Sequence, residues 1–103
     1  MVITWSKHSQ ADLKNFLDNV YEGNDKSANN YIISLMNYIN LLKNNPYLGK
    51  LDQESKIKSI RQLIYRKHKI FYTVYDDYIL ILTVVHSSRN IDNYFKDFLS
   101  NNF

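Results

Sequence analysis

Basic and proton-transferring side chains gather in the second half of the chain, where most of the strand-forming residues also lie. The set comprises Arg61, Lys67, His68, Lys69, His86 and Arg89. Histidine titrates near neutral pH, and arginine can hold phosphate oxygens through two hydrogen bonds. A metal-free ribonuclease needs a base, a cation beside the phosphate and an acid for the leaving oxygen. The set could therefore cleave RNA, although its spacing does not demand that chemistry.

Structural roles fit the same residues. Arg61 could pair with a carboxylate of a helix near the C-terminus, and Arg89 could anchor that helix. His86, at the end of an apolar run, stands where a hydrogen-bonded structural histidine is common. Both interpretations stay open at the level of the residues.

Acidic residues are absent from the segment Lys56–Tyr75, although six lysines and arginines lie there. A basic block on strands suits a polyanion or an acidic protein partner. The candidate partner-binding residues are Lys58, Arg61, Arg66, Lys67 and Lys69. The alternative is a solvated hairpin whose lysines prevent edge-to-edge aggregation.

Several classes of site are disfavoured by what the chain lacks. It has no cysteine, and its three histidines, His8, His68 and His86, lack the helical spacing of a zinc pair. Gly23 and Gly49 are its only glycines, so there is no glycine-rich phosphate loop. We therefore expect neither a metal nor a cofactor. The N-terminal residues do not resemble a signal peptide, and no apolar run approaches the ~20 residues that span a bilayer, which predicts a cytoplasmic protein without membrane contact.

The elements that would position these side chains follow from hydrophobic periodicity. Residues 2–5 form a short apolar strand. Ser9 is a candidate N-cap for a helix whose apolar stripe is Leu13, Phe16, Leu17 and Val20. A second helix carries Ala28, Ile32, Leu35, Met36, Ile39 and Leu42 and stops before Pro46.

Strands dominate the second half. After a loop over 47–55, apolar runs near 60–65, 68–75 and 79–86 predict three strands, with Asp76-Asp77 as a hairpin turn. The run 79–86 is apolar on both faces and is expected to be central. A short helix is predicted over 90–98. The chain thus reads as α+β, a single domain over 1–103 in the order β-α-α-β-β-β-α, with a helical hairpin packed on a small, mostly antiparallel sheet.

The order and spacing of these segments resemble the RelE/ParE superfamily of type II toxin–antitoxin toxins. The matching pieces are Ile3-Thr4-Trp5-Ser6, Ala11-Asp12-Leu13, Asn45-Pro46-Tyr47-Leu48-Gly49, Ile60-Arg61-Gln62-Leu63, His68-Lys69-Ile70-Phe71-Tyr72 and His86-Ser87-Ser88-Arg89. Together they cover nearly the whole length of the chain.

The resemblance implies different activities for the two branches. RelE-like members are ribosome-dependent mRNA endonucleases, whereas ParE-like members act on DNA gyrase. Lys69 stands where RelE-like members carry an arginine, and Tyr94 follows Arg89 at a spacing one residue longer than theirs. The pieces Arg61-x-Leu63 and His86-x-x-Arg89 are closer to the ParE-like branch, which we favour.

The resemblance therefore implies a toxin that inhibits growth by binding an essential target such as gyrase, and that a cognate antitoxin neutralises in a hetero-oligomer. One alternative is a ribosome-dependent mRNA endoribonuclease that uses Arg61, Lys69, His86 and Arg89. Another is a non-toxic protein-interaction module. Whether the chain is an enzyme stays open at this level.

Overall fold

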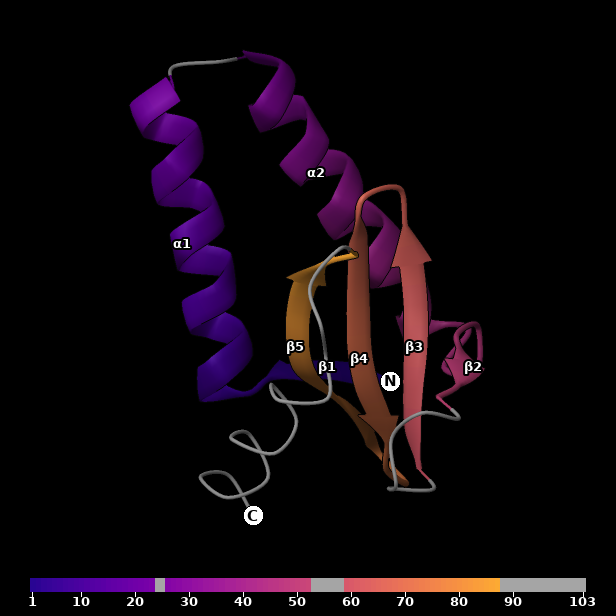
Figure 1. The fold of residues 1–103 in the computed structure, drawn as a ribbon. Coiled ribbons are helices and arrows are strands. Elements are labelled where there is room, and N and C mark those ends of the chain that lie inside the picture. Colours follow the sequence, from indigo (N-terminus) through magenta and orange to yellow (C-terminus); the bar gives the residue numbers. More distant parts are fainter. Residues whose placement is uncertain (24–25, 53–58, 88–103) are drawn as a thin grey trace.

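Two helices and a five-stranded sheet make up the described part of this chain (Figure 1). The computed structural model describes residues 1–23, 26–52 and 59–87. The elements are β1 (Val2–Trp5), α1 (Lys7–Gly23), α2 (Lys26–Asn40), the 3₁₀ helix η1 (Leu41–Lys43), β2 (Lys50–Leu51), β3 (Ile60–Tyr65), β4 (His68–Val74) and β5 (Tyr78–His86). This confirms the α+β prediction. The helix expected over 90–98 lies outside the described residues.

The strands are ordered β1-β5-β4-β3-β2 across the sheet. β1 runs parallel to β5, and the other neighbouring pairs are antiparallel. The prediction that residues 79–86 form the central strand was wrong, because β4 has two strands on each side. The sequence also missed β2, which is only two residues long and lies in the segment predicted to be a loop. The turn at Asp76-Asp77 is confirmed, since the Tyr75 N–H donates to the Tyr78 carbonyl over 2.9 Å.

The two helices differ in how deeply they are buried. The stripe of α2 and η1 is buried at Ile32, Leu35, Ile39 and Leu42, and the last three belong to one core with the sheet. The sheet residues of that core are Leu63, Ile70, Tyr72, Ile79 and Ile81. The described stripe of α1 is only half-buried. The two helices of the expected hairpin are therefore splayed, and α1 makes far more contacts with β5 than with α2 (Figure 1).

Side chains at its first turns fix α1 against β5. The Ser6 hydroxyl accepts from the Ser9 N–H over 3.0 Å, so Ser6 is the N-cap, and the prediction of Ser9 was wrong by three residues. The Ser6 hydroxyl also donates to the carbonyl of Leu82 over 2.9 Å. One carboxylate oxygen of Asp12 accepts from the Thr83 hydroxyl over 2.7 Å and from the Val84 N–H over 3.2 Å. Asp12 thus supplies a hydrogen-bond acceptor to the edge of β5 beyond the point where β1 ends at Trp5.

No helix among the described residues has the length and apolar character needed to cross a membrane.

Candidate functional site

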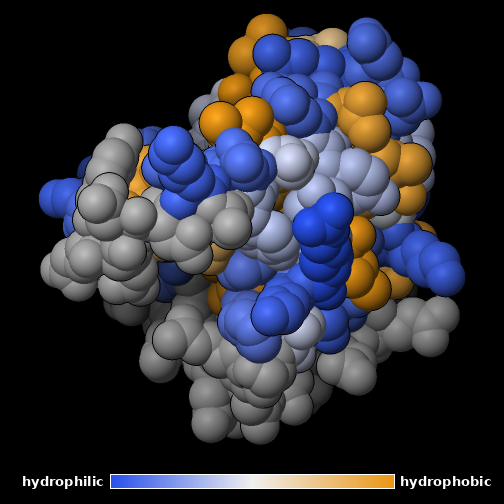
Figure 2. Space-filling view, turned by 90° about the horizontal axis from the view of Figure 1, so that it is seen from above, coloured by the Kyte–Doolittle hydropathy of each residue, from blue (hydrophilic) through white to orange (hydrophobic). Residues whose placement is uncertain are grey.

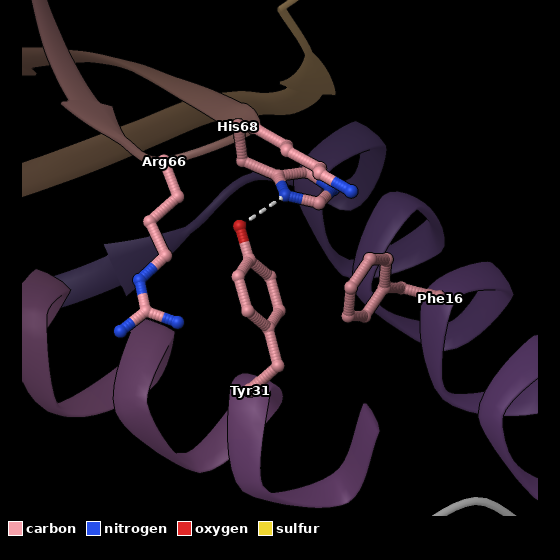
Figure 3. A pocket seen from close by; sticks show the side chains of 5 residues that line it. Phe16, Tyr31, Arg66 and His68 are labelled. Atoms are coloured by element: carbon pink, nitrogen blue, oxygen red, sulfur yellow. Dashed lines mark hydrogen bonds between the residues drawn. The ribbon is translucent and has the colours of Figure 1, made fainter. Parts of the chain in front are cut away.

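A pocket of about 370 Å³ opens between the two helices at the turn that joins β3 to β4 (Figure 3). Its lining residues are Phe16 of α1, Tyr31 of α2, Arg66 and Lys67 of the turn, and His68 at the start of β4. Arg66 has a φ of 49°, in the left-handed region that non-glycine residues seldom adopt. This backbone conformation makes the tight β3–β4 turn and places two cations at its tip.

A hydrogen bond joins the strand to the second helix inside this pocket. The Tyr31 hydroxyl lies 2.8 Å from Nδ1 of His68 and 3.3 Å from the carbonyl oxygen of Tyr65 (Figure 3). The Tyr31 hydroxyl can donate to Nδ1, or it can accept from Nδ1–H and donate to the Tyr65 carbonyl. The first arrangement requires a neutral imidazole, whereas the second is compatible with a neutral or a protonated one.

Aromatic rings surround His68 and exclude water from it. Phe16 meets the imidazole edge-on, with ring centroids 4.8 Å apart, and the ring of His86 on β5 lies 5.6 Å away. Burial lowers the pKa of His68 below its ordinary value, and the charges of His86 and Lys67 lower it further. Burial likewise raises the pKa of Tyr31. At neutral pH the pocket therefore holds an uncharged imidazole and an uncharged phenol, with Arg66 and Lys67 as its cations.

A second pocket, of about 330 Å³, is also lined by Phe16 and His68. It is lined mainly by apolar side chains, including Leu13 of α1, Leu35 of α2 and Val84 of β5. His86 also lines it. Phe16 and His68 line both pockets, and we call the two pockets together the recess.

The predicted catalytic residues are dispersed in the sheet. Arg61 pairs with Tyr72, whose ring lies in the core under α2 and η1, so Arg61 shares that face. His86 pairs with His68 at the opposite end of the sheet. Lys69 alternates with His68 and Ile70 and therefore points to the other face. Arg89 and Lys58 lie outside the described residues.

Arg61 has a structural environment that the sequence did not predict. Its Nη1 donates to the carbonyl of Gly49 over 2.8 Å, and its guanidinium lies 4.8 Å from the ring centroid of Tyr47. No carboxylate in the described part of the chain lies within ion-pair distance of it. The expected partner on a helix near the C-terminus belongs to residues that are not described.

Sequence reasoning missed two residues of the recess. Phe16 was assigned to the core stripe of α1, and Tyr31 was not singled out because it borders the apolar stripe of α2. His68 was named as a basic group and not as a site residue. A tyrosine beside Ile32, where an aliphatic residue would complete the stripe, was the available signal for a polar contact at this position.

Hydrophilic and hydrophobic side chains adjoin one another on the surface of this end of the molecule. Figure 2 looks down on the end that carries the β3–β4 turn, and strongly hydrophilic side chains project there beside hydrophobic patches. Among the predicted partner-binding residues that the structure describes, Arg66 and Lys67 alone line the recess. The described residues contain no group of three side chains able to hold a metal ion.

Comparison with known proteins agrees with this architecture. The family model of the ParE toxin of the type II toxin–antitoxin system parDE matches residues 3–91. The chain belongs to the ParE toxin family. Among solved structures, it is similar to a chain of the chromosomal ParDE system from P. aeruginosa, with a TM-score of 0.67 and 21% identity. That match covers 84% of this chain and 95% of the other. No curated protein sequence matches significantly.

The family assignment confirms the resemblance seen in the sequence and makes this chain the toxin component of a type II system. The structural likeness, at its low identity, supports the ParE-like fold alone.

Proposed function

We propose that this ParE-family chain arrests growth by binding an essential protein, with DNA gyrase as the first candidate, and that a cognate antitoxin neutralises it. The family match over residues 3–91 carries the proposal. The favoured target follows from the closeness of the sequence to the ParE-like branch.

The recess between α1, α2 and the β3–β4 turn is the proposed antitoxin site. An apolar anchor of the antitoxin would enter the pocket against Phe16 and Tyr31, and neighbouring carboxylates would meet Arg66 and Lys67. Buried apolar anchors supply most of the affinity of such an interface, while opposite charges speed association. Because the helices are splayed, the antitoxin anchor would enter the recess without rearrangement of the core.

Induced expression of the chain, alone and together with the proposed cognate antitoxin, tests the proposal. Expression alone should stop growth, and co-expression should restore it. Purified toxin should inhibit DNA supercoiling by gyrase, and primer extension should reveal no new mRNA cleavage. Harmless accumulation of folded protein would contradict the toxin assignment and favour the non-toxic interaction module.

The ribonuclease alternative makes the opposite prediction for the same assays. It requires ribosome-dependent cleavage that His86→Ala abolishes while the protein stays folded. The placement of Arg61, Lys69 and His86 weighs against it, because Lys69 faces away from the other two and Arg61 lies at the far end of β3. Cleavage that depends on His86 would revive it.

Charge reversals at two nearby lysines test the antitoxin site. Lys67→Glu and Lys69→Glu change the net charge equally, but only Lys67 lines the recess. Both variants should slow association, because steering depends on the overall field. Only Lys67→Glu should also speed dissociation, by about two- to fivefold, as expected when an exposed ion pair is lost. Stopped-flow binding across a salt series measures both rates. Equal dissociation rates for the two variants would exclude this site.

A further inference from the structure

A cluster of exposed apolar side chains lies on the side of the molecule away from the recess. Tyr47 is 66% exposed, Leu48 is 44% exposed and Leu51 is 52% exposed. They belong to the segment between η1 and β3, at the edge of the sheet opposite β1 (Figure 1). We call Tyr47, Leu48 and Leu51, together with Arg61 between them, the edge patch.

The backbone beneath the edge patch is held rigidly. The buried hydroxyl of Tyr72 accepts from the Gly49 N–H over 2.8 Å and donates to the carbonyl of Pro46 over 2.9 Å. The guanidinium of Arg61 holds the Gly49 carbonyl from the side. Gly49 fits only because it lacks a side chain, since a Cβ there would lie 2.7 Å from the Tyr72 hydroxyl oxygen. Three hydrogen bonds thus order a loop whose own apolar side chains remain in water.

Arg61 gives this patch a charge as well as a shape. Leu51 is the cross-strand partner of Arg61, so the two side chains share one face, and the ring of Tyr47 lies over the guanidinium. One Nη1 bond to a backbone carbonyl uses only part of the donor capacity of a guanidinium. Lys43 and Lys50 add positive charge nearby, against Asp52 alone among the described residues of this segment. The complement is a carboxylate flanked by apolar side chains.

We propose that the edge patch is a second interaction surface, which binds a segment of the growth target in which a carboxylate that meets Arg61 is flanked by apolar side chains. The proposal rests on the toxin function proposed above. An ordered aromatic and aliphatic patch around a guanidinium has the composition of interface hot spots, in which tyrosine and arginine are enriched. Three apolar side chains around one cation favour a protein over a nucleic acid, whose binding needs several phosphate contacts. The target would then bind away from the antitoxin recess.

A double substitution with a matched control separates the two surfaces. Tyr47→Ser with Leu51→Ser removes the anchors and leaves Arg61, Gly49 and Tyr72 intact. Ile64→Ser is the control, because Ile64 is 54% exposed on β3 and pairs with Lys69 on the other face of the sheet. Growth inhibition per amount of toxin should fall at least about tenfold in the double variant and stay unchanged in the control. The antitoxin dissociation constant, from calorimetry, should change by less than about twofold.

Two substitutions of opposite charge at one position test the sign of the partner's charge. Leu51→Glu should weaken growth inhibition more than Leu51→Lys, since glutamate competes for Arg61 and repels an acidic segment. Melting temperatures close to that of the wild type would show that both variants fold, as expected for a residue that is half exposed. Equal inhibition by the two would overturn the proposal.

The remaining outcomes also decide. A double variant as toxic as wild type would overturn this inference and leave the toxin function standing. Antitoxin affinity reduced about tenfold would assign the patch to the antitoxin, loss of a self-associated form in sedimentation would assign it to a second copy, and loss of oligonucleotide binding in fluorescence anisotropy would assign it to nucleic acid. Each would overturn the proposal. A wild-type chain that does not inhibit growth would remove both proposals together.

Discussion

Two tyrosines that pack on the same face of the sheet, Tyr72 of β4 and Tyr31 of α2, are used in different ways. Tyr72 is fully buried and holds two backbone groups of the loop before β2. Tyr31 is half-buried, lines a recess and bonds to a buried histidine that aromatic rings surround. The contacts of Tyr72 all lie within the fold and stabilise it, whereas the two helices diverge around Tyr31. At the β2 end, packing orders the loop. At the recess end, the side chains of this chain leave a pocket unfilled.

The same contrast separates the two helices. α2 places Leu35 and Ile39 at 2% and 0% exposure in the core. α1 is tied to β5 through polar bonds of Ser6 and Asp12, and its apolar residues border the two pockets. A helix that is secured by its first turns and half-exposed along its apolar face is suited to receive a partner.

Truncation of one leucine on each helix should give the largest difference in the loss of unfolding free energy. Leu35→Ala removes a buried core side chain and should cost ~2–5 kcal/mol of unfolding free energy. Leu17→Ala, on the half-buried stripe of α1, should cost about 1 kcal/mol. Urea denaturation of both variants measures these free energies. Equal losses would mean that α1 belongs to the core as much as α2 does.

Removal of each tyrosine hydroxyl should give a smaller difference in unfolding free energy between the β2 end and the recess end. Tyr72→Phe leaves the buried Gly49 N–H without its acceptor and should cost about 1–3 kcal/mol. Tyr31→Phe breaks a partly exposed bond and should cost about 0.5–1.5 kcal/mol. Thermal melts at neutral pH compare the two. A larger loss from Tyr31→Phe would show that the recess is the more tightly ordered end.

The smallest expected effect concerns pH and is confined to the recess. His68 has a folded-state pKa below 6.5, mainly because it is buried, so the native state binds fewer protons there than the unfolded state. Its neutral form is fully compatible with folding above about pH 6.5, and stability is lost as the pH falls from there through the lowered pKa. Urea midpoints at pH 7.5 and 5.5 should therefore differ more for wild type than for His68→Gln. An equal difference would place the responsible proton elsewhere.

Long-range pairing limited how much of the fold could be predicted from sequence. Periodicity located β1, both helices and the three long strands, because each has enough residues to show its apolar pattern. β2 has two residues, so it has no pattern, and it exists because Gly49 allows the loop to approach Tyr72. The central strand was misidentified because β4 and β5 are both buried along most of their length, so an apolar run on both faces does not distinguish the middle strand from its neighbour.

Residue types alone predicted the kind of partner better than the place where it would bind. The acid-free block from Lys56 to Tyr75 and the family motifs are local properties of the chain, and the motifs led to the correct family. Which cations act together depends on strand register and face, and a shift of one residue moves a side chain to the opposite face of the sheet. Lys67 and Lys69, two residues apart, differ in their surroundings because the β3–β4 turn at Arg66 places Lys67 beside Tyr31 and His68. That juxtaposition joins residues from α2 and β4, and only tertiary packing could decide it.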